Sequence, residues 1–151
     1  MAVSLFRRVQ LASTKKAAIF VSIHCNSSST SKGKGTEIFY YAKGGKEGNQ
    51  PGLAKRLGGE ILRHLCHDLP LTSRGVKAGN FYVIREATMP SVLVETAFLT
   101  DPKDAKLLGS ARYRQQIACA IAKGINEYFQ SSSPARIERA TCRLGGDRSI
   151  H

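Results

Sequence analysis

Residues 91–99, SVLVETAFL, form an almost unbroken apolar run that contains one carboxylate, Glu95. A short run of this kind, rich in β-branched residues and preceded by the turn residues TMP, predicts a strand that is buried on both faces. Such strands are typical of sheets covered by helices. Glutamate is almost never fully buried without a partner. Glu95 is therefore either a salt-bridged structural residue or a desolvated general base beside a metal or another cation.

A second apolar run, AAIFVSI at residues 17–23, predicts another buried strand, and it ends on His24. In open α/β sheets, ligands bind at the carboxyl ends of the strands, so His24 and Glu95 are candidates for one site. Imidazole is a good zinc ligand, but a catalytic zinc needs about three protein ligands. A single histidine at a strand end is more often a hydrogen-bonded structural residue than a metal ligand.

Strands and helices alternate along the rest of the chain. This alternation predicts an α/β fold of three layers, in which a largely parallel or mixed sheet carries helices on both faces. We expect one domain over residues 1–130, followed at 131–151 by a flexible or non-native tail without hydrophobic periodicity. The other predicted elements are helices at 4–14, 51–67, 100–108 and 110–129, strands at 36–42 and 81–85, and a loop at 71–80.

The formal net charge of +12 predicts attraction to polyanions such as nucleic acid, anionic lipid or an anionic cell-wall polymer. The basic residues form no run of five or six, and no nucleic-acid recognition motif is present, so we expect no nucleic-acid partner. No apolar run approaches the roughly 20 residues needed to cross a bilayer, so no membrane insertion is expected. The first residues do not have the pattern of a signal peptide.

Longer stretches of the sequence resemble a known family. FVSIHCNSS, KGTEIFYY, LTSRGVKAGNFYVIREATMPSVLVETAFLTDPKDAKLL and YRQQIACAIAKGINEYF occur in this order between Val3 and Phe129. Together they resemble the zinc-dependent N-acetylmuramoyl-L-alanine amidases of the amidase-3 type. These are cell-wall hydrolases with a zinc-hydrolase-like α/β fold. A set of motifs this long is far more specific than any one of them.

The resemblance implies a function and a role for particular residues. It implies a peptidoglycan hydrolase that cleaves the amide between N-acetylmuramic acid and L-alanine, with Zn²⁺ as cofactor and a periplasmic, extracellular or cell-wall location. His24 matches a zinc ligand, and Glu95 matches the catalytic glutamate that activates water. Asn26, Arg74 and Asn80 are candidates for substrate binding, although each is equally well explained as a capping or solvated loop residue. A regulatory or cell-wall-binding module outside this chain is also expected.

The chain departs from the family pattern at its beginning. Two further zinc ligands, a histidine and a glutamate, are expected ahead of the helix at 4–14, and the sequence holds neither. His64 and His67 have a spacing that can bind a metal, but they belong to a helix that we expect to pack away from the strand ends. The alternative hypothesis is therefore a catalytically inactive fragment that binds anionic cell-wall polymer through its basic surface.

Overall fold

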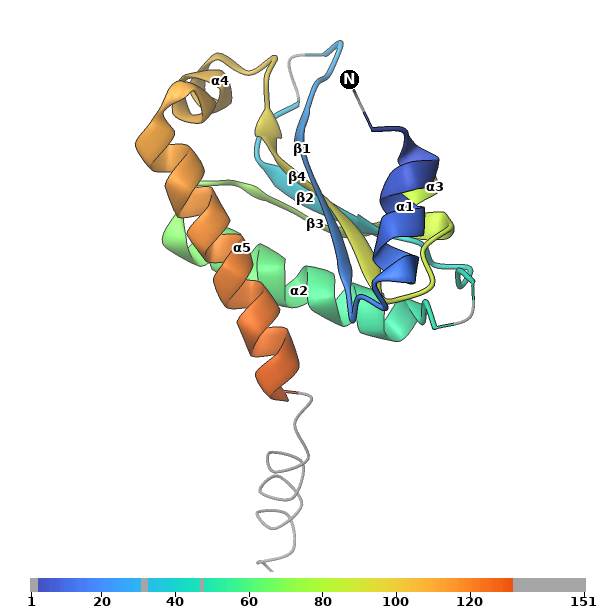
Figure 1. Cartoon of the computed structure of the whole chain (residues 1–151). Coiled ribbons are helices and arrows are strands. Elements are labelled where there is room, and N and C mark those ends of the chain that lie inside the picture. Colours follow the sequence, from blue (N-terminus) through green and yellow to red (C-terminus); the bar gives the residue numbers. More distant parts are fainter. Residues whose placement is uncertain (1–2, 31–32, 47, 132–151) are drawn as a thin grey trace, which may run out of the picture.

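The computed structural model describes residues 3–30, 33–46 and 48–131. A four-stranded sheet lies between two layers of helices (Figure 1). The elements are α1 (Leu5–Thr14), β1 (Phe20–Asn26), β2 (Thr36–Tyr40), α2 (Pro51–Asp68), β3 (Ser73–Ala78), α3 (Tyr82–Arg85), β4 (Ser91–Phe98), α4 (Pro102–Gly109) and α5 (Ala111–Ser131).

The sheet is mixed, with the strand order β1-β4-β2-β3. β1 runs parallel to β4, β4 runs antiparallel to β2, and β2 runs parallel to β3. β4 is the run SVLVETAF, and seven of its eight residues are buried. The predicted α/β sheet with helices on both faces is confirmed, and β4 lies at its centre as the apolar run indicates.

The larger core lies between the sheet and the helices α2 and α5. Its apolar side chains come from one face of β2 and β4 and from one stripe of each helix, at intervals of about one helical turn. α2 and α5 cross so closely that a Cβ added at Gly124 would lie 2.5 Å from the Cα of Ile61. The fully buried members of this core include Ile38, Leu57, Ile61, Leu65, Val92 and Val94.

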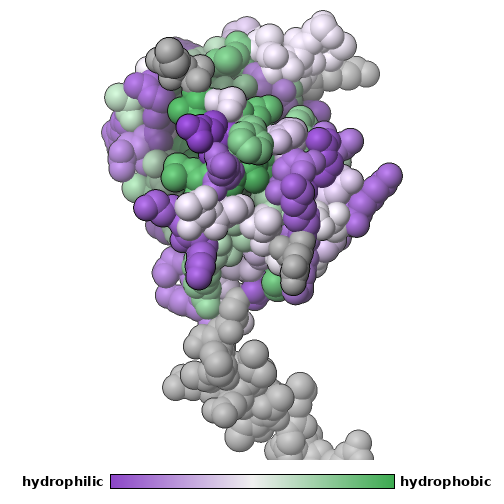
Figure 2. All heavy atoms as spheres, turned by 45° about the vertical axis from the view of Figure 1, so that its right-hand side comes forward, coloured by the Kyte–Doolittle hydropathy of each residue, from purple (hydrophilic) through white to green (hydrophobic). Residues whose placement is uncertain are grey.

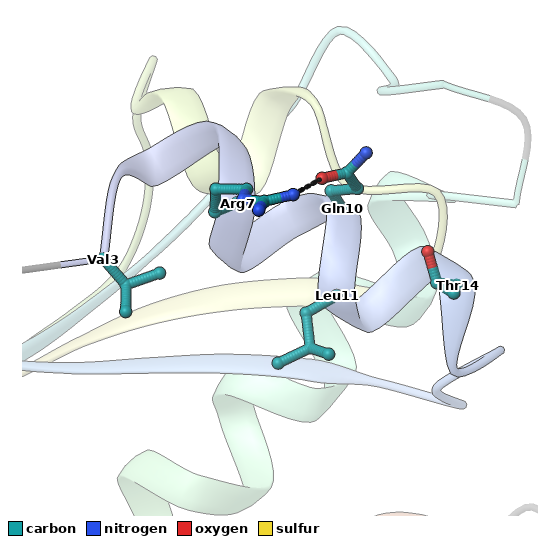
Figure 3. A pocket seen from close by; sticks show the side chains of 5 residues that line it. All are labelled: Val3, Arg7, Gln10, Leu11 and Thr14. Atoms are coloured by element: carbon teal, nitrogen blue, oxygen red, sulfur yellow. Dashed lines mark hydrogen bonds between the residues drawn. The ribbon is translucent and has the colours of Figure 1, made fainter.

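The other face of the sheet is covered only in part, by α1 and α3. Val9, Val83, Ile84 and Leu93 form a small core there. β1 is an edge strand. Val3, which precedes α1, and Leu11, on α1, are exposed apolar side chains. In the view of Figure 2, exposed hydrophobic residues (green) lie next to hydrophilic ones (purple). Val3 and Leu11 border a shallow surface pocket on α1 (Figure 3).

Three predicted elements differ from the observed ones. β1 begins at Phe20 and extends to Asn26, so His24 lies inside the strand and not after it. Residues 73–78, predicted as part of a loop, form β3. Residues 82–85, predicted as strand, form the helical turn α3, whose adjacent residues Val83 and Ile84 are both buried. A short apolar run has too few residues for its period to distinguish strand from helix.

The described part of the chain contains no helix with the length and hydrophobicity needed to span a membrane. α5 ends at Ser131, and the rest of the predicted tail, 132–151, lies outside the described residues.

We predict that Gly124→Ala destabilises the fold by about 1–3 kcal/mol, because the new methyl group overlaps the backbone of α2 and must push the helices apart. Gly59→Ala is the matched control, since a Cβ at Gly59 meets no atom within 4 Å. Alanine there stabilises the helix by about 0.5–1 kcal/mol. Urea unfolding midpoints measure both, and an unchanged midpoint for Gly124→Ala contradicts the close helix crossing.

Candidate functional site

Three titratable side chains form a row across neighbouring strands. His24 on β1 is the register partner of Glu95 on β4, and Glu95 is the register partner of Glu37 on β2. Side chains of register partners point to the same face of a sheet. The row therefore lies on the face that α1 and α3 cover only in part, beyond the small core that contains Leu93.

An irregularity in β4 follows the row directly. His24 pairs with Glu95, but Asn26 pairs with Phe98, so β4 contains one residue more than β1 over this interval. The Thr96 hydroxyl donates to the His24 carbonyl oxygen over 2.9 Å, and the Thr36 hydroxyl donates to the Glu95 carbonyl oxygen over 2.9 Å. Bulges of this kind re-aim side chains and are frequent beside active sites. Here, the two threonine hydroxyls hold the backbone around the row.

The Glu95 carboxyl group is poorly compensated. Its Oε2 atom is buried and has no hydrogen-bond partner among the described residues. Burial, and after it the negative charge of Glu37, raises the pKa of Glu95 to about 7. A carboxyl group with a pKa near neutrality exchanges a proton readily at physiological pH, as a general acid or base must.

The Glu37 carboxylate, in contrast, is fully engaged. Its Oε1 accepts from Asn26 Nδ2 over 2.8 Å, and its Oε2 accepts from Arg74 Nε over 2.9 Å and from Lys77 Nζ over 2.6 Å. Burial on its own would raise the pKa of Glu37, but the hydrogen bonds and positive charges of Lys77 and Arg74 outweigh it and hold that pKa below its usual value. Glu37 is therefore the permanently charged carboxylate of the row.

Two of the three predicted substrate-binding residues lie at this row. Asn26 and Arg74 both contact Glu37, and Arg74 extends from strand β3 and not from the predicted loop. The Arg74 guanidinium also lies over the Phe98 ring, 5.0 Å from its centroid. Asn80 does not contact Glu37: its Oδ1 accepts from Arg85 Nη1 over 2.8 Å.

The described residues do not form a complete zinc site. His24 shares a hydrogen bond of 2.8 Å between its Nε2 and the Ser22 hydroxyl, and no group of three or more His, Cys, Asp or Glu side chains in the described ranges could hold a metal ion. His64 and His67 lie on α2, which packs against the opposite face of the sheet. They therefore do not join His24.

Sequence analysis missed Glu37 and placed Lys77 in a loop. Glu37 stands in TEIFY, where the alternation of polar and apolar residues gives no sign of which face carries the site. Because residues 71–80 are predicted as a loop, the sequence does not indicate which strand face carries Lys77. One signal was available in the sequence. Glu37 is two positions from Phe39 and therefore shares its face of the strand. A carboxylate on an apolar face needs a cationic partner.

The family model described as N-acetylmuramoyl-L-alanine amidase, Amidase_3, matches residues 1–127. N-acetylmuramoyl-L-alanine amidase LytC of Bacillus subtilis is 40% identical over 127 residues, which cover 84% of this chain and 25% of LytC. The catalytic domain of CwlV, an N-acetylmuramoyl-L-alanine amidase from Bacillus (Paenibacillus) polymyxa, superimposes with a TM-score of 0.75 at 37% identity, covering 86% of this chain and 68% of that domain.

The CwlD amidase of Clostridioides difficile, solved in complex with the GerS lipoprotein, is 33% identical with a TM-score of 0.73, covering 83% of this chain and 61% of that one. The chain spans only part of its curated relatives: it covers between 24% and 58% of the length of three of them. The family match nevertheless covers most of the chain. The chain belongs to the Amidase_3 family of N-acetylmuramoyl-L-alanine amidases.

Proposed function

We propose that this chain is part of a peptidoglycan hydrolase that cleaves the amide between N-acetylmuramic acid and the L-alanine of the stem peptide. The observation that supports this most directly is the register pairing of His24 with Glu95, since these are the two residues that the family resemblance assigns to the reaction. The proposal also accounts for the otherwise costly burial of Glu95 Oε2.

In this proposal, Glu95 is the general base and then the general acid. It accepts a proton from the attacking water and delivers it to the nitrogen of the leaving alanine. A group with a pKa of about 7 can perform both steps at neutral pH. Glu37 cannot exchange with it in this role, because Lys77 and Arg74 keep its carboxylate charged.

Asn26, Arg74 and Asn80 remain our candidates for substrate binding. Asn26 and Arg74 are held beside the row by Glu37, which places amide and guanidinium donors near any substrate at Glu95. Asn80 follows the end of β3, and its Oδ1 accepts a hydrogen bond from Arg85. Because Asn80 does not join the row of His24, Glu95 and Glu37, we propose that it contacts a part of the substrate farther from the scissile bond.

We further propose that zinc is the cofactor and that His24 is one of its ligands. The other ligands would come from sequence outside residues 1–151 or from another polypeptide. β1 is an edge strand, with one side that is unpaired within the described residues. A segment that pairs there would lie next to His24, because edge strands accept an added strand through their free N–H and C=O groups.

The net charge of +12 supports a second candidate function, binding to anionic cell-wall polymer without hydrolysis. Either function places the protein in the periplasm, outside the cell or at the cell wall. It also fits a longer protein with a separate regulatory or wall-binding module. Sedimentation with cell walls that weakens with salt supports binding, and release of new N-terminal alanine supports hydrolysis.

We predict that Glu95→Gln lowers the rate of N-terminal alanine release from purified peptidoglycan by about 10²–10⁴-fold, because glutamine cannot carry the proton. The measurement requires a form of the protein that holds the full ligand set. Glu60→Gln, which removes a carboxylate paired with Arg63 on exposed α2 surface, is the control and should retain the activity. Equal activity of Glu95→Gln and the wild type contradicts the assigned role.

We predict that the chain of residues 1–151, dialysed against buffer with trace zinc, retains far less than one zinc per molecule, because one imidazole does not hold the ion usefully. Elemental analysis by mass spectrometry measures this. One zinc per chain that is lost in His24→Ala would show that the remaining ligands lie within residues 1–151.

We predict that Glu95→Gln stabilises the metal-free fold at alkaline pH. The pKa of Glu95 rises from about 4.5 in the unfolded chain to about 7 in the fold, so its contribution to stability is present below pH 4.5 and is lost as pH rises through 7. The variant should match the wild type near pH 4.5 and exceed it at pH 8, by on the order of 1–2 kcal/mol after solvent screening. Urea unfolding with chelator present measures the difference, and a constant gap between pH 4.5 and 8 contradicts it.

A further inference from the structure

The antiparallel ladder between β2 and β4 ends at the two carboxylates of the row. Its pairs run from Phe39 with Leu93 to Glu37 with Glu95, and no further pair follows among the described residues. Beyond that point, the Thr36 hydroxyl donates to the Glu95 carbonyl oxygen over 2.9 Å. The last pair of a ladder opens most easily, so the two carboxylates depend on support from outside the ladder.

Asp104, in the first turn of α4, joins the two strands at this end. Its Oδ2 atom accepts from the backbone N–H of Gly35 over 2.8 Å and from that of Phe98 over 3.0 Å. Gly35 directly precedes β2, and Phe98 is the last residue of β4, so one carboxylate oxygen holds both strands. Asp104 is 8% exposed and both hydrogen bonds are buried, where such bonds are stronger than at a surface.

Capping of α4 does not account for this carboxylate. Asp104 follows the N-cap residue Asp101 by three positions, where an acid commonly reaches back to the N–H of the cap. Here, the Asp101 N–H donates to the Phe98 carbonyl oxygen over 3.3 Å. The Asp101 side chain caps the helix by accepting from the backbone N–H groups of Lys103 and Asp104. The helix is therefore capped without the Asp104 carboxylate, which serves the strands.

The backbone at Gly35 is adapted to this contact. Its φ is +91°, which residues with a side chain rarely adopt, and a Cβ there would lie 2.2 Å from the Thr72 carbonyl oxygen. The same Thr72 oxygen accepts from the Thr36 N–H over 2.9 Å. Two consecutive N–H groups thus donate to different partners, that of Gly35 to Asp104 and that of Thr36 to the chain ahead of β3.

We infer that Asp104 is a positioning residue for Glu95, the proposed general base. By holding Gly35 and Phe98 to one oxygen atom, it fixes the point at which β2 and β4 separate. Glu37 lies two residues after the first of these anchors, and Glu95 lies three residues before the second. The anchors therefore determine how the two carboxylates face each other. The inference rests on the proposed role of Glu95 in hydrolysis, and Asp104 acts through the backbone without touching the substrate.

The first test is nuclear magnetic resonance of the chain of residues 1–151, without metal or substrate. In the wild type, we expect nuclear Overhauser contacts between the backbone protons of Glu37 and Glu95 and between those of Phe39 and Leu93. Asp104→Ala should lose the first contact and keep the second, because the ladder opens from its unsupported end. Asp104→Asn should keep both, since one amide oxygen can accept from both N–H groups.

Asn49→Ala is the matched control for a loss of stability alone. Asn49 is 4% exposed, and its Nδ2 donates to the Ile84 carbonyl oxygen over 2.7 Å and to the Ser91 hydroxyl over 3.1 Å, at the opposite end of β4. This variant also loses two buried hydrogen bonds but should keep the contact at the row. Thermal unfolding checks that each variant folds. If Asp104→Ala does not fold, Asp104→Glu, whose carboxylate is displaced by one methylene, should weaken the same contact and carries the test.

The second test is hydrolysis by a form of the protein that holds the full ligand set. Asp104→Ala should lower kcat for N-terminal alanine release by about 10–10²-fold, because a misplacement of about 1 Å suffices for a loss of this size. KM should stay within about twofold, since the substrate contacts are kept. Asp104→Asn should recover most of kcat, and Asn49→Ala should remain close to the wild type.

A contact between Glu37 and Glu95 that survives in Asp104→Ala, or in Asp104→Glu where that variant carries the test, overturns the inference. Its equal loss in Asn49→Ala also overturns it, and so does an unchanged kcat in Asp104→Ala. Absence of hydrolysis by the wild type with its full ligand set contradicts the proposed function instead, and the resonance measurement then still decides whether Asp104 positions Glu95.

Discussion

Two carboxylates directly opposite each other on antiparallel strands are the constraint on which this site depends. Like charges at such positions repel, and Glu37 and Glu95 are register partners inside a sheet. The surroundings of the two carboxylates differ, and their pKa values move in opposite directions. Lys77 and Arg74 compensate Glu37, while Glu95 receives no such partner and its pKa rises to about 7. One carboxylate thus becomes a fixed charge, and its neighbour becomes a group that can take up and release a proton.

Irregularities in the strands make that asymmetry possible. The additional residue in β4 follows Glu95, and β3 likewise contains one residue more than β2, at Gly75, whose φ is +89°. The first lies in β4 directly after the residue that pairs with His24, and the second brings Lys77 to the face of Glu37. A fully regular sheet built from the same residues would place Arg74 and Lys77 on opposite faces. The helices on the other face supply the stability that such departures cost, through the large core between α2 and α5.

Sequence patterns predicted the layers of the fold and that His24 and Glu95 lie close together, because both follow from the apolar runs and the positions of the polar residues within or after them. They did not predict Glu37 as a site residue, and they placed Lys77 in a loop and not on a strand beside Glu37. The role of Glu37 arises from β2 lying antiparallel beside β4, a topology that no local pattern encodes. The role of Lys77 arises from one backbone angle at Gly75, and SRGVK shows polar residues in a segment that resembles a loop. The helix α3 was missed because four residues are too few to display a period.

The position of His24 follows from the same topology. It lies on β1 at the edge of the sheet, one strand away from Glu95 and two from Glu37. At the β3 end of the row, Arg74 and Lys77 neutralise the charge of Glu37. At the β1 end, the row finishes with the imidazole of His24. In the proposed zinc site, the added ligands would therefore lie on the β1 side. A cation bound there would be the counterpart of Lys77 and Arg74 at the other end: it would favour the ionised form of Glu95, which in its absence is opposed by burial and by Glu37. In the proposed site, a metal bound at His24 would thus shift Glu95 toward the ionised form from which it acts as a base.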